Sequence, residues 1–235
     1  MKQDFTSINV IIDQSGSMGY LTTDTIGSFN GFVTEQKLVP GDAAFTLCTF
    51  NESARLVHDF VKLAAVPALD SKTYRPSGGT ALLDAMGTTI NSVGAKLAAL
   101  PEEERPSKVI FLIITDGQEN SSRNFTKEQV KSMVEHQRDV YSWEFVFMGA
   151  NIDAIDEGTS LGIAAQNTMN YAPSAAGTRS LYKSVSSSMT GYRSGNSSKA
   201  SYFDPNAVPP APVNPSPTPV TTKTGRDSKG RFTSK

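Results

Sequence analysis

The sequence has few of the residues that build disulfides and zinc sites: its 235 residues include one cysteine and two histidines. A single cysteine cannot form a disulfide within the chain, and Cys48 lies in the apolar stretch 45–50, which predicts a buried, inert thiol. His58 and His136 are far apart in the sequence. One cysteine and two distant histidines argue against a conventional zinc site, which needs several such ligands close together.

Neither sign of charge is in excess, and long apolar runs are missing. The formal net charge is −1, which provides no overall attraction to nucleic acid or anionic lipid. No run approaches the roughly 20 apolar residues that a membrane span needs. Residues 1–6 contain no apolar core of a signal peptide. We therefore expect a cytoplasmic protein without a membrane partner.

The composition predicts one folded domain followed by a polar extension. Apolar residues make up 38% of the chain, enough for one substantial core, which we place in residues 1–192. Residues 193–222 are rich in Ser and Asn and then in Pro, which predicts a disordered linker. Residues 223–235 form a basic tail. Weak, salt-sensitive contact of this tail with nucleic acid and a solvated terminus without a partner are both open.

Strand and helix patterns alternate along the predicted domain. The expected strands span residues 8–13, 43–50, 54–60, 109–114, 141–148 and 167–171. The expected helices lie within residues 26–38, 82–100, 126–134, 153–157 and 181–192. Pro101 ends the second helix, and Thr126 to Gln129 has the form of a capping box that opens the third.

This alternation predicts an α/β fold: a doubly wound, mainly parallel sheet, Rossmann-like, with helices on both faces. Parallel strands need crossover connections, and these are right-handed, so the helices cover the sheet on both sides. The exception is the strand 54–60, which follows the tight connection 51–53 and is expected to pair antiparallel with the strand before it.

Acids and hydroxyls gather where three loops are expected. The apolar run that begins at Ile8 stops at Asp13 and is followed by Ser15 and Ser17, and a second apolar run ends at Thr115-Asp116-Gly117. Between them, Ser77-Gly78-Gly79-Thr80 delivers a hydroxyl just before a predicted helix. Two acids and three hydroxyls form an all-oxygen set, which suits a hard divalent cation.

These three segments resemble the metal-ion-dependent adhesion site of the von Willebrand factor type A (vWA) domain family. The resemblance rests on Asp13-x-Ser15-x-Ser17, Thr80 and Asp116-Gly117, in this order and local context, and extends from about Phe5 to about Tyr192. It implies the strand order 3-2-1-4-5-6 with the hairpin strand at one edge. In having no recognisable signal peptide, the sequence resembles the intracellular members of the family.

The resemblance also implies a function. In the family, hydroxyls such as those of Ser15, Ser17 and Thr80 touch a Mg²⁺ or Mn²⁺ ion, while acids such as Asp13 and Asp116 act largely through water. An Asp or Glu of a partner protein completes the metal's coordination. We therefore expect a non-enzymatic, metal-dependent protein-binding module, an adaptor or assembly component, with metal ligands Asp13, Ser15, Ser17, Thr80 and Asp116.

Topology supports the same location. In the implied order the first and fourth strands are neighbours where the winding reverses, and open α/β sheets bind ligands at that point, beyond the carboxyl ends of the strands. Asp13 and Asp116 end those two strands.

Other interpretations stay open at this point. Ser and Asp also punctuate strand ends and cap helices without any ligand. The Ser-rich first loop is also typical of phosphate-binding loops, so a phosphate-binding or phosphoryl-transfer enzyme is the main alternative. A structural protein of a larger assembly, with the metal site secondary, is another.

Three further residues near the motif have two interpretations each. Asp84 is either an outer partner of the metal ligands or an acid favoured in the first turn of a helix. Glu119 and Asn120 either line the rim of the site or are solvated loop residues.

The pattern Gly158-x-Ser160-x-Gly162 matches that of hydrolases, but it follows a helical stretch and no histidine comes after it.

Overall fold

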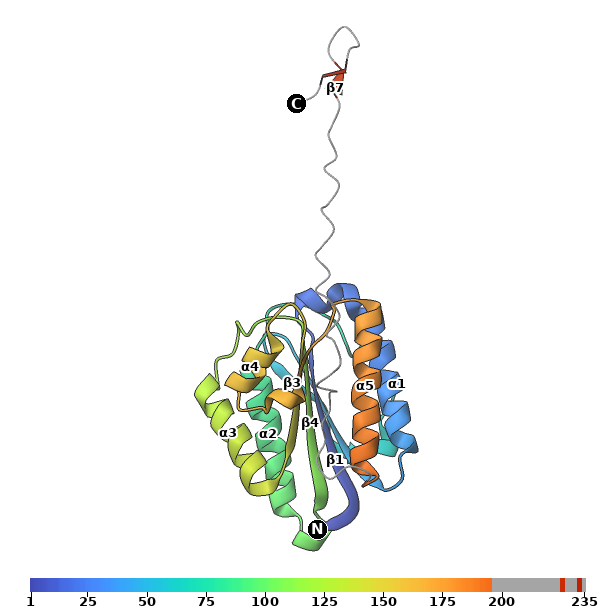
Figure 1. Cartoon of the computed structure of the whole chain (residues 1–235), viewed down its shortest axis with the longest axis vertical. Coiled ribbons are helices and arrows are strands. Elements are labelled where there is room, and N and C mark those ends of the chain that lie inside the picture. The colour runs from blue at the N-terminus through green and yellow to red at the C-terminus, as the bar shows by residue number, and fades with distance from the viewer. Residues whose placement is uncertain (196–224, 227–231, 234–235) are drawn as a thin grey trace.

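The computed structural model describes residues 1–195, 225–226 and 232–233. Its centre is a six-stranded sheet in the order β3-β2-β1-β4-β5-β6 (Figure 1). The strands are β1 Lys2–Asp13, β2 Asp42–Phe50, β3 Ala54–Lys62, β4 Pro106–Thr115, β5 Glu144–Gly149 and β6 Thr168–Asn170. All neighbours are parallel except β2 and β3. The predicted fold class, strand order and antiparallel edge strand are confirmed.

Helices cover both faces of this sheet. The α-helices are α1 Thr22–Leu38, α2 Leu82–Ala99, α3 Lys127–Tyr141, α4 Ala154–Ser160 and α5 Ala175–Arg193. Short 3-10 helices are η1 Gly16–Leu21, η2 Leu63–Ala65, η3 Glu102–Glu104 and η4 Ala165–Asn167. Helices α1 and α5 lie side by side on one face, and α2, α3 and α4 lie on the other (Figure 1). Within the described residues, no helix combines the length and the apolar character that crossing a bilayer requires.

The core consists of two apolar layers, one on each face of the sheet. Successive side chains of the central strand β1 point to opposite layers, because the strand period is two residues. Val10 belongs to the layer beneath α1 and α5, while its neighbour Ile11 belongs to the layer beneath α2. Both side chains are fully buried. Cys48 lies in the second layer, and burial raises the pKa of its thiol to about 11.

The predicted capping box is confirmed at the start of α3. The Thr126 hydroxyl accepts a hydrogen bond from the backbone N–H of Gln129, and the Gln129 side chain accepts one from the backbone N–H of Thr126. These two bonds satisfy N–H groups that a helix start otherwise leaves free.

The predicted start of the fifth strand at residue 141 is wrong. Helix α3 continues through Tyr141, and Ser142 then adopts the left-handed conformation with φ 56°. The backbone N–H groups of Ser142 and Trp143 bond to carbonyls in the last turn of α3, which is how many helices end. Strand β5 therefore begins only at Glu144. Apolar residues alone did not separate the end of the helix from the start of the strand.

The last helix ends at Arg193, one residue beyond the predicted end of the domain. The predicted linker 193–222 and basic tail 223–235 lie outside the described residues, apart from residues 193–195, β7 Gly225–Arg226 and β8 Phe232–Thr233. The two short strands pair with each other antiparallel.

Candidate metal centre

The candidate site lies at the carboxyl edge of the sheet, where β1 and β4 end as parallel neighbours with Ile12 opposite Ile114. Asp13 is the last residue of β1, and Asp116 directly follows β4. From here the chain winds from β1 toward β2 on one side and from β4 toward β5 on the other. The two acids therefore meet at the reversal point, where sheets of this kind bind ligands.

Asp13 is fully buried and held from three directions. Its Oδ1 accepts a hydrogen bond of 2.7 Å from the backbone N–H of Ser15. Its Oδ2 accepts one of 2.6 Å from the hydroxyl of Thr115. The hydroxyl of Tyr74 donates to the Asp13 backbone carbonyl over 2.7 Å. These bonds fix the carboxylate and the start of the loop that follows.

Two serine hydroxyls connect the neighbourhood of Asp13 to Asp116. The hydroxyl oxygens of Ser15 and Ser17 are 3.0 Å apart, and the Ser17 hydroxyl donates to Asp116 Oδ1 over 2.6 Å. The other oxygen of that carboxylate, Asp116 Oδ2, is buried and has no hydrogen-bond partner. Ser15 and Asp116 are almost fully buried, whereas Ser17 is exposed, so the cluster opens to solvent at Ser17.

Thr80 joins the cluster through the loop that carries it. The backbone N–H of Gly16 donates to the carbonyl of Gly78 over 3.0 Å, which ties this loop to the first one. A Cβ added at Gly117 would lie 3.6 Å from Thr80 Oγ1 and 3.8 Å from Ser17 Oγ. The two hydroxyls therefore converge on Gly117. The structure brings all five predicted site residues together.

Two glycines allow this close approach. Gly78 has φ +72°, in the left-handed region that side chains rarely adopt. A Cβ at Gly79 would lie 2.2 Å from Ser121 Oγ and 2.8 Å from Asn120 Oδ1, which is too close for either contact. A side chain at residue 79 would therefore displace the Asn120 oxygen that accepts the Thr80 backbone N–H.

Glu119 and Asn120 were expected either to line the rim of the site or to be solvated loop residues. Neither interpretation describes them fully. The Asn120 side-chain oxygen accepts a hydrogen bond of 2.9 Å from the backbone N–H of Thr80, and the Asn120 backbone N–H donates to the Thr80 carbonyl over 3.0 Å. Glu119 accepts backbone hydrogen bonds from Leu83, at the start of α2, and from Ser121. Both residues position the loop that presents Thr80.

Asp84, on α2, holds the loop that follows β4. Its carboxylate accepts three backbone N–H groups at 2.9–3.0 Å, from Arg123, Asn124 and Phe125. A fourth bond of 3.0 Å comes from the Asn124 side chain. Burial raises the pKa of Asp84, but these hydrogen bonds outweigh it and hold the pKa below its ordinary value. Asp84 lies in the first turn of α2, as one of its two predicted interpretations has it, and through these bonds it also supports the segment after β4.

In contrast to Asp84, the two acids of the cluster, Asp13 and Asp116, have pKa values above the ordinary one. Burial raises the pKa of Asp13 above its ordinary value of 3.8, although hydrogen bonds from Thr115 and Ser15 oppose the rise. Burial also raises the pKa of Asp116; the hydrogen bond from Ser17 opposes this rise, and the charge of Asp13 adds to it. Within residues 1–195 neither acid forms an ion pair with Lys or Arg. Negative charge is therefore concentrated here without a balancing cation.

The donor set fits a hard divalent cation. All its side-chain donors are oxygens, and the buried, unpartnered Asp116 Oδ2 is an acceptor that a cation would satisfy. In the part of the chain that the structure describes, no three His, Cys, Asp or Glu side chains gather closely enough to hold a metal by themselves. A metal at this site therefore requires the hydroxyl groups as well as the two acids.

Sequence reasoning missed Tyr74 and Thr115 as parts of the site. Thr115 stands directly before Asp116, so its position beside the motif was a usable signal. Tyr74 lies 61 residues from Asp13 in a segment without secondary structure, and nothing local in the sequence marks it as a partner of that strand end.

Comparisons with known proteins give structural matches only. No protein-family model matches the sequence, and neither does any curated protein. A von Willebrand factor type A protein from Catenulispora acidiphila matches with 16% identity and a TM-score of 0.53, over 81% of this chain and 43% of that chain. The PilB minor pilin from Streptococcus sanguinis matches with 11% identity and a TM-score of 0.60, over 85% and 64%.

A third match is proximal thread matrix protein 1 from the mussel byssus, in a structure whose adhesion-site motif is occupied by zinc. It has 16% identity and a TM-score of 0.54, over 81% of this chain and 47% of that chain. This chain thus spans less than two thirds of the length of each of these proteins. At such low identity the matches show a shared vWA-type fold alone, and they carry no information on function.

Proposed function

We propose that this protein is a metal-dependent binding module in which Asp13, Ser15, Ser17, Thr80 and Asp116 hold one Mg²⁺ or Mn²⁺ ion and a partner protein supplies an Asp or Glu. The observation that supports this most is Asp116 Oδ2, a buried carboxylate oxygen without a hydrogen-bond partner. A buried polar atom of this kind is costly unless a ligand satisfies it. The zinc-occupied motif of the mussel protein supports divalent-metal binding in this fold.

The residues of the site divide into those that contact a ligand and those that hold them. The hydroxyls of Ser15, Ser17 and Thr80 provide neutral oxygens, and the two acids provide the charge. Thr115 and Tyr74 immobilise Asp13, so the geometry exists before any ligand arrives. When bound, the ion supplies a Lewis-acidic position that a carboxylate from outside can fill. The exposed Ser17 marks the side from which such a group can approach.

A binding module fits this arrangement better than the alternative of a phosphate-binding enzyme. Burial raises the pKa values of both acids, so negative charge is already disfavoured at the site, and a phosphate would add more unless a cation stood between them. The hydrolase-like pattern also fails structurally: Ser160 is the last residue of α4, and its hydroxyl donates to the Glu157 carbonyl over 2.6 Å. It does not stand on the strand-to-helix turn that such a nucleophile needs.

Metal binding is tested first, with MgCl₂ and MnCl₂ titrated into the full chain by calorimetry and thermal unfolding. We expect one ion per chain, and a stabilisation of about 2.7 kcal/mol at a metal concentration of 100 times the dissociation constant. Asp116→Ala should abolish both signals, whereas Asp139→Ala, a matched loss of an exposed acid on α3, should leave them unchanged. A wild-type protein that shows neither heat nor a shift in millimolar magnesium contradicts the proposed site.

Partner capture is tested second, by mass spectrometry of proteins retained on the immobilised chain in magnesium and in chelator. We expect a partner that Asp13→Ala, Ser15→Ala and Asp116→Ala all lose, because each change removes a ligand or its charge. Thr80→Ala should keep part of the metal affinity and still bind the partner poorly. Capture that persists undiminished in chelator, or in folded Asp116→Ala protein, would rule out the mechanism.

A further inference from the structure

One tyrosine beside the candidate metal site, Tyr20, is largely exposed, with 62% of its surface open to solvent. It lies on the 3-10 helix η1, which begins directly after Ser15. Side chains three residues apart on a 3-10 helix lie above one another, so Tyr20 stands on the same side of η1 as Ser17. Ser17 is the exposed residue at which the cluster of acids and hydroxyls opens to solvent. Tyr20 therefore borders this opening.

The connection between β5 and α4 brings a second polar side chain to the same border. Asn151 is exposed and has φ 57°, a left-handed conformation that Asn adopts more readily than most residues. Its Nδ2 donates to the backbone carbonyl of Asp116 over 3.4 Å. The Asn151 side chain also forms a hydrogen bond with the hydroxyl of Tyr20. Tyr20 thus reaches from η1 to the β5–α4 connection, beside Asp116.

The surroundings keep the Tyr20 hydroxyl protonated and able to donate. Partial burial raises the pKa of Tyr20, the hydrogen bond with Asn151 opposes this rise, and the charge of Asp116 adds to it. A hydrogen bond that lowers the pKa of a phenol is one that its oxygen accepts, so the O–H group itself remains available. Tyr20 therefore offers an uncharged hydrogen-bond donor next to the candidate metal site.

A carboxylate that binds the metal through one oxygen has a second oxygen that needs a donor. The backbone N–H groups of Ser15, Gly16 and Thr80 already donate to acceptors within the loops. The Ser17 hydroxyl donates to the carboxylate of Asp116. An oxygen that gives up its hydrogen bonds to water without gaining a new one weakens binding. The hydroxyl of Tyr20 supplies such a donor at the opening.

A guanidinium would be a stronger partner for a carboxylate, and two arginines lie on neighbouring loops. Arg75 Nε donates to a backbone carbonyl of its own loop over 3.1 Å. The backbone of Arg123 is bonded to Asp84, on α2. Tyr20, by contrast, lies one 3-10 turn from Ser17, at the opening itself.

We propose that Tyr20 donates a hydrogen bond to the free oxygen of the carboxylate that the metal captures, so that the ion and the phenol together hold both carboxylate oxygens. This role rests on the proposed function, because it needs the bound ion. An O–H donor bonded to a charged oxygen forms a short bond, roughly twice as strong as one between neutral groups. Tyr20 would thus favour a carboxylate over a neutral ligand that gives the metal a single oxygen.

The test uses the full chain loaded with Mn²⁺, with acetate as the probe. Bound manganese is measured by the loss of the electron paramagnetic resonance signal of the free ion. Bound acetate is measured by the paramagnetic relaxation of its methyl protons, with magnesium-loaded protein as the diamagnetic reference. We expect Tyr20→Phe to keep the manganese affinity within about twofold and to bind acetate at least about fivefold more weakly, because it loses a hydrogen bond to a charged group but no ligand of the ion.

Two control variants accompany this change. Tyr141→Phe removes the hydroxyl of a similarly exposed tyrosine at the far end of α3 and should alter neither affinity. Arg123→Gln should bind acetate like the wild type, and a loss there in place of a loss in Tyr20→Phe overturns the proposal.

The two measurements separate the possible failures. Equal acetate affinity in Tyr20→Phe and wild type overturns the role of Tyr20 and leaves the metal site standing. A wild type that binds manganese but no acetate overturns carboxylate capture, and one that binds no manganese overturns the metal site. The role of Tyr20 falls with either.

Discussion

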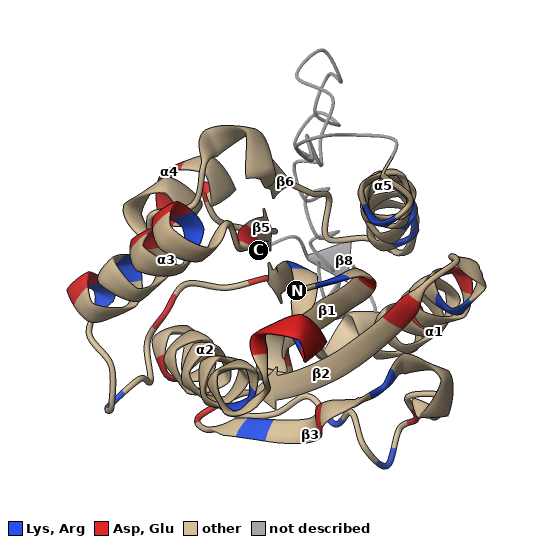
Figure 2. Cartoon of the chain, turned by 90° about the horizontal axis from the view of Figure 1, so that it is seen from below, with Lys and Arg blue, Asp and Glu red and all other residues tan. Residues whose placement is uncertain are grey.

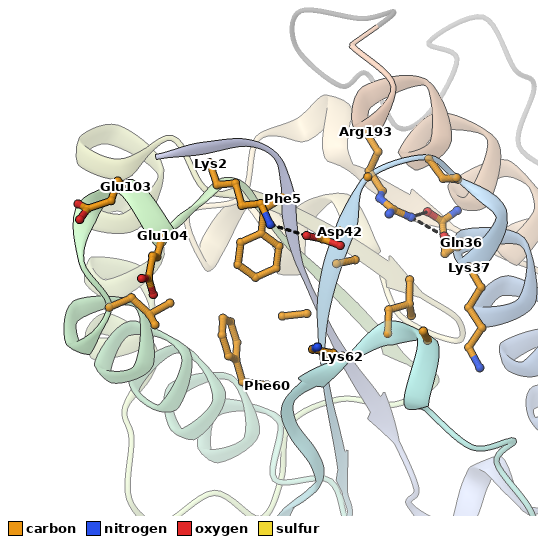
Figure 3. Close-up of a pocket in the computed structure, with 17 residues that line it drawn as sticks. Lys2, Phe5, Gln36, Lys37, Asp42, Phe60, Lys62, Glu103, Glu104 and Arg193 are labelled. Carbon is orange, nitrogen blue, oxygen red and sulfur yellow. Dashed lines mark hydrogen bonds and ion pairs between the residues drawn. The ribbon is translucent and has the colours of Figure 1, made fainter.

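The two edges of the sheet hold their charged side chains in different surroundings. At the carboxyl edge, three loops from distant parts of the chain are tied together by acids that accept backbone N–H groups, and the acids of the candidate metal site stay buried. At the amino edge (Figure 2), the ends of strands and helices leave an open cavity lined by apolar side chains together with charged residues of both signs (Figure 3). Negative charge is thus placed in a buried polar network that opens at Ser17 at one edge, whereas charges of both signs border open space at the other. The first arrangement suits a small ion, whereas the second encloses far more space than a single ion fills.

Removing the acid that organises the carboxyl edge should have the largest effect. Asp84→Ala deletes four hydrogen bonds and leaves three backbone N–H groups of residues 123–125 without their acceptor. We expect a loss of about 3 kcal/mol or more in the free energy of unfolding, measured with urea, because hydrogen bonds to a charged group are worth about 1.5–3 kcal/mol each and are not additive.

The matched change at the amino edge is Glu103→Ala. That acid is exposed on η3 and forms no ion pair with the described residues, so its removal should cost less than about 0.5 kcal/mol. Similar losses in the two variants would show that the carboxyl edge does not depend on its acids as described.

A smaller effect of opposite sign is expected for Asp116→Asn in chelator. The folded-state pKa of Asp116 is raised, so the wild-type protein loses the corresponding stability as the pH rises from the ordinary value of 3.8 through the raised pKa. The variant cannot ionise here, and its Oδ1 can still accept the Ser17 hydroxyl. It should therefore match the wild type at low pH and exceed it by on the order of 1 kcal/mol at neutral pH, by urea unfolding at each pH.

The lowered pKa of Asp84 acts in the other direction, but it is common to both proteins and cancels in the difference. Saturating magnesium should reverse the order, because only the wild type keeps both acids of the site. A wild-type protein that stays more stable than the variant at neutral pH without metal would contradict the assigned electrostatics.

The smallest effect is expected for truncation after Ser194. This change removes the predicted linker and tail but retains Arg193, so the free energy of unfolding should change by less than about 0.5 kcal/mol. Truncation after Tyr192 is the control, because it also removes the two hydrogen bonds that join Arg193 to Gln36. We expect the shorter chain to lose about 1–3 kcal/mol in a thermal or urea melt. A large loss on truncation after Ser194 would place part of the tail on the domain.

The sequence predicted what depends on local patterns. The order of elements followed from periodicity, the start of α3 from its capping box, and the positions of Asp13 and Asp116 from the ends of apolar runs. The strand order came from the family resemblance. Apart from the meeting of the three motif segments, contacts between distant segments were not predicted, because no local pattern marks them: Asp84 bonds to residues 39–41 positions away, and Arg193 to a residue 157 positions away. The metal-ligand role of the five site residues stays a prediction.

The hydrogen bond from Ser17 to Asp116 has a kinetic consequence, because it joins residues 99 positions apart in the chain. Such a contact forms only after β1 and β4 have met, and closing so long a loop is slow. Any ligand that needs both residues therefore finds no binding site in the unfolded chain or in an early, locally folded state. Such a ligand slows unfolding and so lengthens the lifetime of the native protein. The rate of folding stays almost unchanged.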